Sequence, residues 1–94
     1  MTTLDEIEGF QIVRAIVASE VPFTRIVARD QKSYCGIILD DNNRKPVCRL
    51  HFNHKQLYIG LFDAEKVERR EALGAVEEIY QHAEELRETV RRYL

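Results

Sequence analysis

The amino-acid sequence predicts an α+β fold, in which two helices pack on one face of a four-stranded antiparallel meander sheet. Between residues 29 and 63, three runs of alternating apolar residues are separated by two polar turns, which is typical of consecutive hairpins. On both sides of this region, apolar residues recur at helical spacing. The chain has 94 residues, of which 45% are apolar, so we expect residues 1–94 to build one core and one domain.

The first predicted element is an N-terminal helix that begins at Thr3 and runs to about Ser19, before Pro22. Thr3 is suited to cap this helix, because Glu6 follows three positions later and completes a capping-box pattern. The apolar stripe of the helix consists of Ile7, Phe10, Val13, Ile16 and Val17.

The last predicted element is a long C-terminal helix from about Gly74 to Tyr93. Its apolar positions are Val76, Ile79, Tyr80, Ala83, Leu86, Val90 and Tyr93. Five glutamates are interleaved with its arginines, which argues against a helix that reads DNA.

The pairing of the predicted strands follows from the alternation of side chains and the length of each turn. A turn at His54-Lys55 places Phe52, Leu50 and Cys48 opposite Leu57, Ile59 and Leu61. Across the turn from Asp41 to Pro46, the register that keeps one face apolar places Leu39, Ile37 and Cys35 beside Cys48, Leu50 and Phe52. A fourth strand, from about Arg25 to Asp30, is expected at the edge of the sheet.

The second face of this sheet is where we expect function. We expect it to carry Tyr34, Gly36, Ile38, Arg49, His51, Asn53, Tyr58, Gly60 and Phe62, together with either Arg25, Val27 and Arg29 or the alternate set of the edge strand. Aromatic and arginine side chains on an open sheet are suited to stack bases or to bind a protein. The same residues also serve in ordinary cross-strand packing, and the sequence leaves these alternatives open.

Composition excludes several classes of protein. A net charge of −2 argues against a strongly basic, nonspecific nucleic-acid binder. Neither an apolar run long enough to cross a membrane nor a secretory signal is evident, so we expect a cytoplasmic protein without a membrane partner. The two cysteines, Cys35 and Cys48, lie in predicted strands without the spacing of a metal or redox motif, and we expect them to be buried.

No catalytic residue, metal site or cofactor is predicted. Asp40 and Asp41 precede a strand, as acidic metal ligands do in nucleases, but the next strand supplies no carboxylate, so we interpret them as turn residues. We expect His51 to be a surface histidine, because no serine, cysteine or carboxylate is predicted nearby on its face. His54 and His82 are too scattered to indicate a metal site.

Three stretches of the chain are distinctive as sequence patterns: RDQKSYCGIILDDNNRKPVCRLHFN, KQLYIGLFD and the final HAEELRETVRRYL. Together they resemble the carboxy-terminal domain of predicted bacterial restriction endonucleases, in which an amino-terminal nuclease-like domain similar to that of type I restriction subunits precedes it. The resemblance implies a setting in DNA restriction, with the chemistry in that neighbouring nuclease domain. It also implies that the chain is a fragment or accessory module of a larger protein.

Two hypotheses of different classes follow. The first is a noncatalytic accessory domain that binds DNA through the open sheet face and the hairpin tips, with Tyr34, Arg44, Lys45, Arg49, His51, Lys55 and Tyr58 as binding residues. The alternative is a protein-interaction or dimerisation domain that uses the same face or the edge strand, which would make a homodimer a partner. A third and weaker hypothesis, based only on Asp40 and Asp41, is a nuclease.

Overall fold

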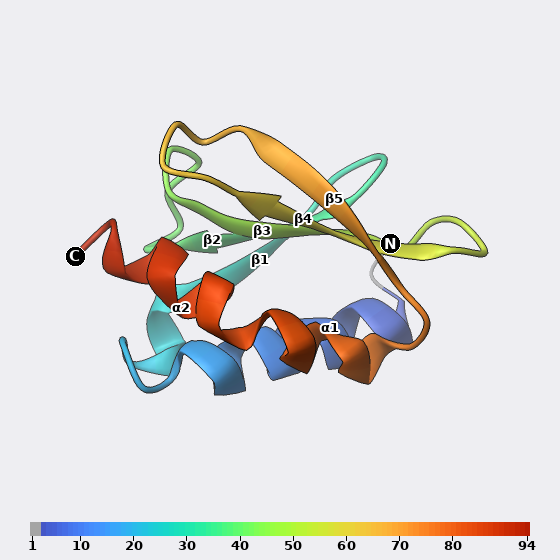
Figure 1. The fold of residues 1–94 in the computed structure, drawn as a ribbon, viewed down its shortest axis with the longest axis horizontal. Coiled ribbons are helices and arrows are strands. Elements are labelled where there is room, and N and C mark those ends of the chain that lie inside the picture. Colours follow the sequence, from blue (N-terminus) through green and yellow to red (C-terminus); the bar gives the residue numbers. More distant parts are fainter. Residues whose placement is uncertain (1–2) are drawn as a thin grey trace.

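The structure is a computed structural model, and it describes residues 3–94 (Figure 1). In chain order its elements are α1 (Leu4–Val17), a 3₁₀ turn (Phe23–Arg25), β1 (Ile26–Asp30), β2 (Cys35–Leu39), β3 (Pro46–His51), β4 (Leu57–Phe62), β5 (Glu68–Leu73), a 3₁₀ segment (Val76–His82) and α2 (Ala83–Arg91). The predicted α+β class is confirmed, but the prediction of four strands is wrong, because the sheet has five.

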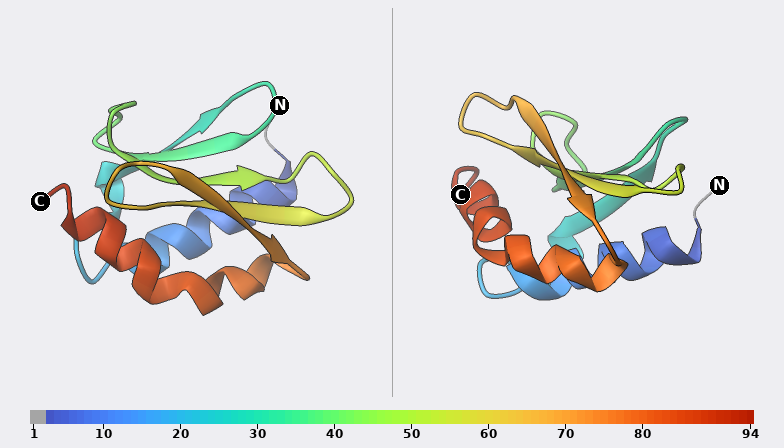
Figure 2. Two further views of the ribbon diagram at one scale, coloured as in Figure 1. Left: turned by 45° about the horizontal axis from the view of Figure 1, so that its top comes forward. Right: turned by 45° about the vertical axis from the view of Figure 1, so that its right-hand side comes forward.

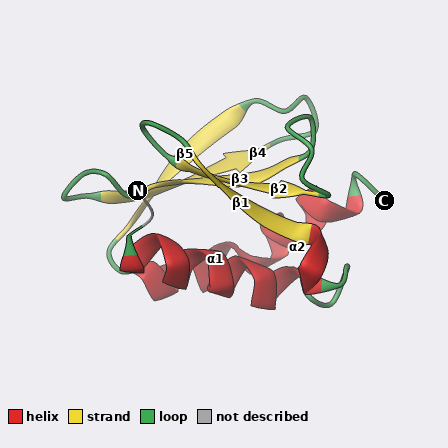
Figure 3. Cartoon of the chain, turned by 180° about the vertical axis from the view of Figure 1, so that it is seen from behind, coloured by secondary structure: helices red, strands yellow, loops and turns green. Residues whose placement is uncertain are grey.

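The five strands form an antiparallel meander in the order β1-β2-β3-β4-β5. Both helices lie on the same side of this sheet in every view (Figures 1 and 2), and the view from behind shows the same arrangement (Figure 3). The opposite side is covered by no helix of the described chain, and we call it the open face. None of the helices within residues 3–94 combines the length and the apolar character needed to cross a membrane.

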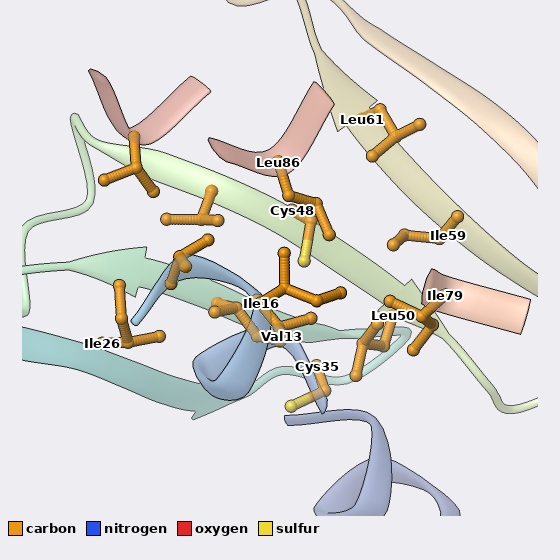
Figure 4. Close-up of a cluster of buried hydrophobic side chains, with 14 of the residues drawn as sticks. Val13, Ile16, Ile26, Cys35, Cys48, Leu50, Ile59, Leu61, Ile79 and Leu86 are labelled. Carbon is orange, nitrogen blue, oxygen red and sulfur yellow. The ribbon is translucent and has the colours of Figure 1, made fainter. Parts of the chain in front are cut away.

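The hydrophobic core lies between the helices and the sheet (Figure 4). Val13 and Ile16 of α1 meet the buried strand residues Cys48 and Leu50, and Leu86 of α2 is fully buried with them. Cys35 and Cys48 are free thiols in this core, as predicted. Burial raises the pKa of the Cys35 thiol to about 11 and raises the pKa of Cys48 further still, so both remain protonated near neutral pH.

The predicted capping box of α1 is confirmed. The Thr3 hydroxyl accepts the Glu6 N–H at 3.1 Å, and the Glu6 carboxylate accepts the Thr3 N–H at 2.8 Å. The predicted stripe is wrong at its first position, because Ile7 is exposed while Glu6 and Gly9 are buried. A Cβ at Gly9 would lie 2.9 Å from Leu50 Cδ1, so the absence of a side chain allows this turn of the helix to approach the sheet closely.

The predicted register is confirmed for one hairpin and wrong for the other. Leu50 pairs with Ile59 and Cys48 with Leu61, as expected. Ile37, however, pairs with Cys48 and not with Leu50. Asp40 and Asp41 both adopt left-handed backbone, with φ of 58° and 55°, and a bulge follows Ile37, so the chain reverses earlier than predicted and the pairing is shifted by two residues. A shift of two residues leaves every side chain on its predicted face.

The C-terminal part of the chain differs from the prediction in two ways. Residues 68–73 form the unpredicted strand β5, and the helical segment begins as a 3₁₀ helix at Val76, becoming α-helical only at Ala83. Of the expected apolar stripe, Val76, Ile79, Leu86 and Val90 are buried, whereas Tyr80 is exposed.

Candidate nucleic-acid interface

The open face carries most of the residues predicted for it. The strand pairings place Gly36, Arg49 and Gly60 side by side, and His51 opposite Tyr58. Tyr34 immediately precedes β2, and its ring lies 5.7 Å from that of His51. The structure therefore brings Tyr34, Arg49, His51 and Tyr58 together.

A row of alternating arginine and glycine crosses all five strands of this face. Arg29 of β1 pairs with Gly36 of β2, which pairs with Arg49 of β3, then Gly60 of β4 and Arg70 of β5. Because neighbouring strands lie about 4.8 Å apart, successive arginines of the row are separated by about 10 Å at the backbone. Gly36 and Gly60 contribute no side chain to the row, and the places above them are approached by the neighbouring side chains of Tyr34 and Glu68. We call Arg29, Arg49 and Arg70 the arginine row.

Arg49 is held in place by aromatic and acidic neighbours. Its guanidinium carbon lies 4.6 Å from the centre of the Tyr34 ring and 5.2 Å from that of Phe62. Its Nη1 donates to Glu68 Oε1 at 3.0 Å. Two rings and one carboxylate thus fix the orientation of a cation whose side chain is still 37% exposed.

The prediction for His51 is wrong, because this histidine is only 4% exposed and has a carboxylate partner. Its Nε2 lies 2.5 Å from Glu68 Oε2. A carboxylate only accepts hydrogen bonds, so Nε2 carries the proton and donates. Glu68 belongs to the unpredicted strand β5, and it lies over Gly60, where a Cβ would overlap its carboxylate. The pair makes His51 a positioning residue beneath the face and not part of its exposed surface.

The paired acids of the nuclease hypothesis are bound to arginines. Asp40 accepts two hydrogen bonds of 2.7 Å from Arg25, and these hold the pKa of the Asp40 carboxyl below its ordinary value. Asp41 accepts from Arg29 Nε at 2.8 Å. Within residues 3–94, no group of three or more His, Cys, Asp or Glu side chains is placed to share a metal ion. Asn42 supports the turn, because its Oδ1 accepts the Arg44 N–H at 2.9 Å.

The three hairpin-tip residues do not lie together. Arg44 and Lys45 lie in the loop that precedes β3, whereas Lys55 lies in the loop that follows it. The six residues of β3 separate these loops by roughly 20 Å. Lys45 Nζ is 3.6 Å from Asp40 Oδ2, but Arg44, Lys55 and Arg70 make no side-chain ion pair with any described residue.

A hollow of about 230 Å³ opens on this face above Gly36. Arg29 and Arg49 flank it, and its complete lining is Arg29, Gln31, Tyr34, Gly36, Ile38, Asn43, Pro46, Cys48 and Arg49. Gln31 and Asn43 use their side-chain amides in no hydrogen bond with a described residue. The hollow therefore combines unused donors and acceptors with the apolar residues Ile38 and Pro46.

Charge is distributed unevenly between the two layers. Residues 22–74, which contain the sheet, have ten Lys or Arg and seven Asp or Glu, a net charge of +3. The remaining residues, mainly the helices, have four Lys or Arg and nine Asp or Glu, a net charge of −5. The two values sum to the net charge of −2 for the whole chain, so the near-neutral total conceals a basic sheet and an acidic helical layer.

Sequence reasoning missed Glu68 and Arg70, because both lie on β5. It did not decide on which face of the sheet Arg29 lies, and it named neither Gln31 nor Asn43 as site residues. One signal was available: the twelve residues from 63 to 74 would be an unusually long connection without secondary structure. That length indicates an additional element between β4 and the last helix.

Comparison with family models, with curated proteins and with solved structures gives no match to this chain.

Proposed function

We propose that this chain is a noncatalytic accessory domain that binds DNA through the open sheet face. The observation that carries the proposal is the arginine row, which presents three guanidinium groups on one helix-free surface. Arginine binds phosphate in a bidentate manner and also stacks on bases. The net charge of +3 on residues 22–74 favours the approach of a polyanion from the side of the sheet.

The proposal assigns different roles to the residues of the face. Arg70, Arg44 and Lys55 are the cations available for phosphate, since none of them is neutralised by a described carboxylate. Arg49 is already ordered by Tyr34 and Glu68, so it loses little conformational entropy when it binds. Lys45, Tyr34 and Tyr58 border this surface, and His51 holds Glu68 below it.

The proposed setting is the one that the sequence resemblance implies. In it, the domain assists a neighbouring restriction-type nuclease domain in the bacterial cytoplasm, and cleavage is not a property of this chain. The reduced, buried cysteines are consistent with that compartment.

Substitution of Arg70 tests the proposal with little risk to the fold. Arg70 is exposed and has no described partner, whereas removal of Arg49 would leave the carboxylate of Glu68 with one partner fewer. In a fluorescence-anisotropy titration of labelled duplex DNA, we expect Arg70→Gln to weaken binding by about three- to tenfold. We also expect the slope of log affinity against log salt to fall by about one.

Arg14→Gln is the matched control, because it removes the same charge from α1 on the opposite side of the molecule. Arg14 lies there over the rings of Phe10 and Phe23, and its Nε donates to the Phe23 carbonyl oxygen at 3.3 Å. Equal losses of affinity in both variants would contradict a binding site on the open face, as would wild-type binding that does not change with salt.

A further inference from the structure

The hollow above Gly36 is too small for a whole drug-sized ligand and has room only for a part of a larger molecule. Its volume of about 230 Å³ is below the roughly 300–1,000 Å³ of pockets that enclose whole drug-sized ligands. It lies between two members of the arginine row, so any DNA on the open face passes over it. The question is which group of the nucleic acid enters it.

The electrostatics of the hollow disfavour a phosphate. Each flanking guanidinium already has a carboxylate: Arg29 binds Asp41 at 2.6 Å, and Arg49 binds Glu68 at 3.0 Å. These four groups carry no net charge, which reduces the attraction for an anion.

The same chemistry favours a nucleobase. A base edge presents donors and acceptors together, and these match the amides of Gln31 and Asn43 and the remaining N–H groups of the two arginines. The lining also includes the apolar residues Ile38 and Pro46 and the side-chain-free Gly36, which suit contact with the flat face of a ring. Tyr34 adds an aromatic wall.

We infer that the hollow above Gly36 is a pocket for one unstacked DNA base, formed by Gln31, Asn43, Tyr34 and the two flanking arginines. This inference rests on the proposed DNA-binding function and specifies its substrate, namely DNA that contains an unpaired or easily extruded base. Such a base costs least to remove from the stack when it has no partner.

The test compares two labelled duplexes of identical length, one fully paired and one with a single unpaired 2-aminopurine. We expect the wild-type protein to bind the second duplex about tenfold more tightly, because stacking and edge contacts are gained without breaking a base pair. We also expect the fluorescence of 2-aminopurine to change when the base leaves the stack.

Gly36→Val fills the hollow. A Cβ at Gly36 would lie 3.4 Å from Tyr34 Cε1 and 3.7 Å from the Arg29 carbonyl oxygen, which are ordinary contacts, and β-branched residues are favoured in strands. We expect the ratio of the two affinities to fall to about one in this variant. Gly36→Ala, which adds a single methyl group, should give an intermediate ratio. Ala72→Val is the matched control, since Ala72 is exposed, faces the same side from β5 and does not line the hollow.

The outcomes separate the inference from the proposed function. Salt-dependent binding of both duplexes without a preference, or a preference that Gly36→Val retains, would overturn the base pocket and leave DNA binding intact. Binding of neither duplex would overturn both. The inference of a base pocket is supported if the preference for the duplex with the unpaired base is lost in Gly36→Val and kept in Ala72→Val.

Discussion

Glu68 connects two side chains that differ in their access to solvent. One of its oxygens accepts from the buried His51, and the other accepts from the half-exposed Arg49. Because hydrogen bonds to a charged group stabilise by about 1.5–3 kcal/mol when they are shielded from water, this carboxylate is central to the order of the open face. It fixes the position of Arg49 before any partner arrives.

A substitution at Gly60 tests this role of Glu68. A Cβ at Gly60 would overlap the carboxylate, so we expect Gly60→Ala to displace Glu68 and leave His51 buried without its partner. The free energy of unfolding should fall by about 1–3 kcal/mol, measured by urea denaturation.

Gly36→Ala is the control for this experiment, because Gly36 occupies the equivalent place in the row and its nearest neighbour would be 3.4 Å away. We expect it to change stability by less than about 1 kcal/mol. If both variants lose the same free energy of unfolding, the cause is the replacement of a glycine within a strand and not the displacement of Glu68.

At the scale of elements, the loop between β2 and β3 is stabilised by charge. Arg25 immediately precedes β1, and its two hydrogen bonds to Asp40 join the start of the first strand to the end of the second. The pKa of Asp40 is lowered in the folded state, so the folded protein binds this proton less readily than the unfolded chain. The resulting stabilisation is complete above the ordinary pKa of 3.8 and is lost as the pH falls through the lowered value.

We therefore expect Asp40→Asn to reduce the loss of stability in acid. Asparagine tolerates the left-handed backbone at φ 58°, so the loop conformation is retained while the titrating group is removed. The measurement is the difference between the urea midpoints near neutral pH and below pH 3.8. If this difference between midpoints is the same in Asp40→Asn as in the wild type, the pairing of Asp40 with Arg25 does not contribute to the loss of stability in acid.

Elements whose residues alternate in polarity could be predicted from the sequence, and β5 could not. In β2, β3 and β4, apolar residues mark the buried face, so strand positions and faces were correctly predicted even where the register was wrong by two residues. In β5, the side facing the helices carries Arg69 and Glu71, and Arg69 binds Glu85 of α2. Ion pairs replace apolar contacts there, and the pattern that indicates a strand disappears.

The same reason explains which parts of the candidate site were predicted. Tyr34, Arg49 and Tyr58 follow directly from alternation in well-marked strands. The arginine row, the Glu68 pairing with His51 and the hollow depend on β5, on β1 or on loops, whose positions require the register of the whole sheet.

At the scale of the molecule, the two layers differ in charge, and we assign binding to only one of them. The acidic helical layer covers the core, and the basic sheet exposes the face to which we assign binding. A protein that presents opposite charges on opposite sides should approach DNA in one orientation. A symmetric dimer formed through the open face would instead bury the arginine row, so DNA binding and that mode of assembly are mutually exclusive.

The most direct test of DNA binding by the open face is a ¹H–¹⁵N NMR titration that observes the arginine Nε–H groups while duplex DNA is added. We expect the signals of Arg29, Arg49 and Arg70 to shift in proportion to saturation, and the signals of the helix arginines Arg14, Arg87 and Arg91 to remain in place. Shifts confined to the helix arginines, or no shift at a saturating concentration of DNA, would contradict the account.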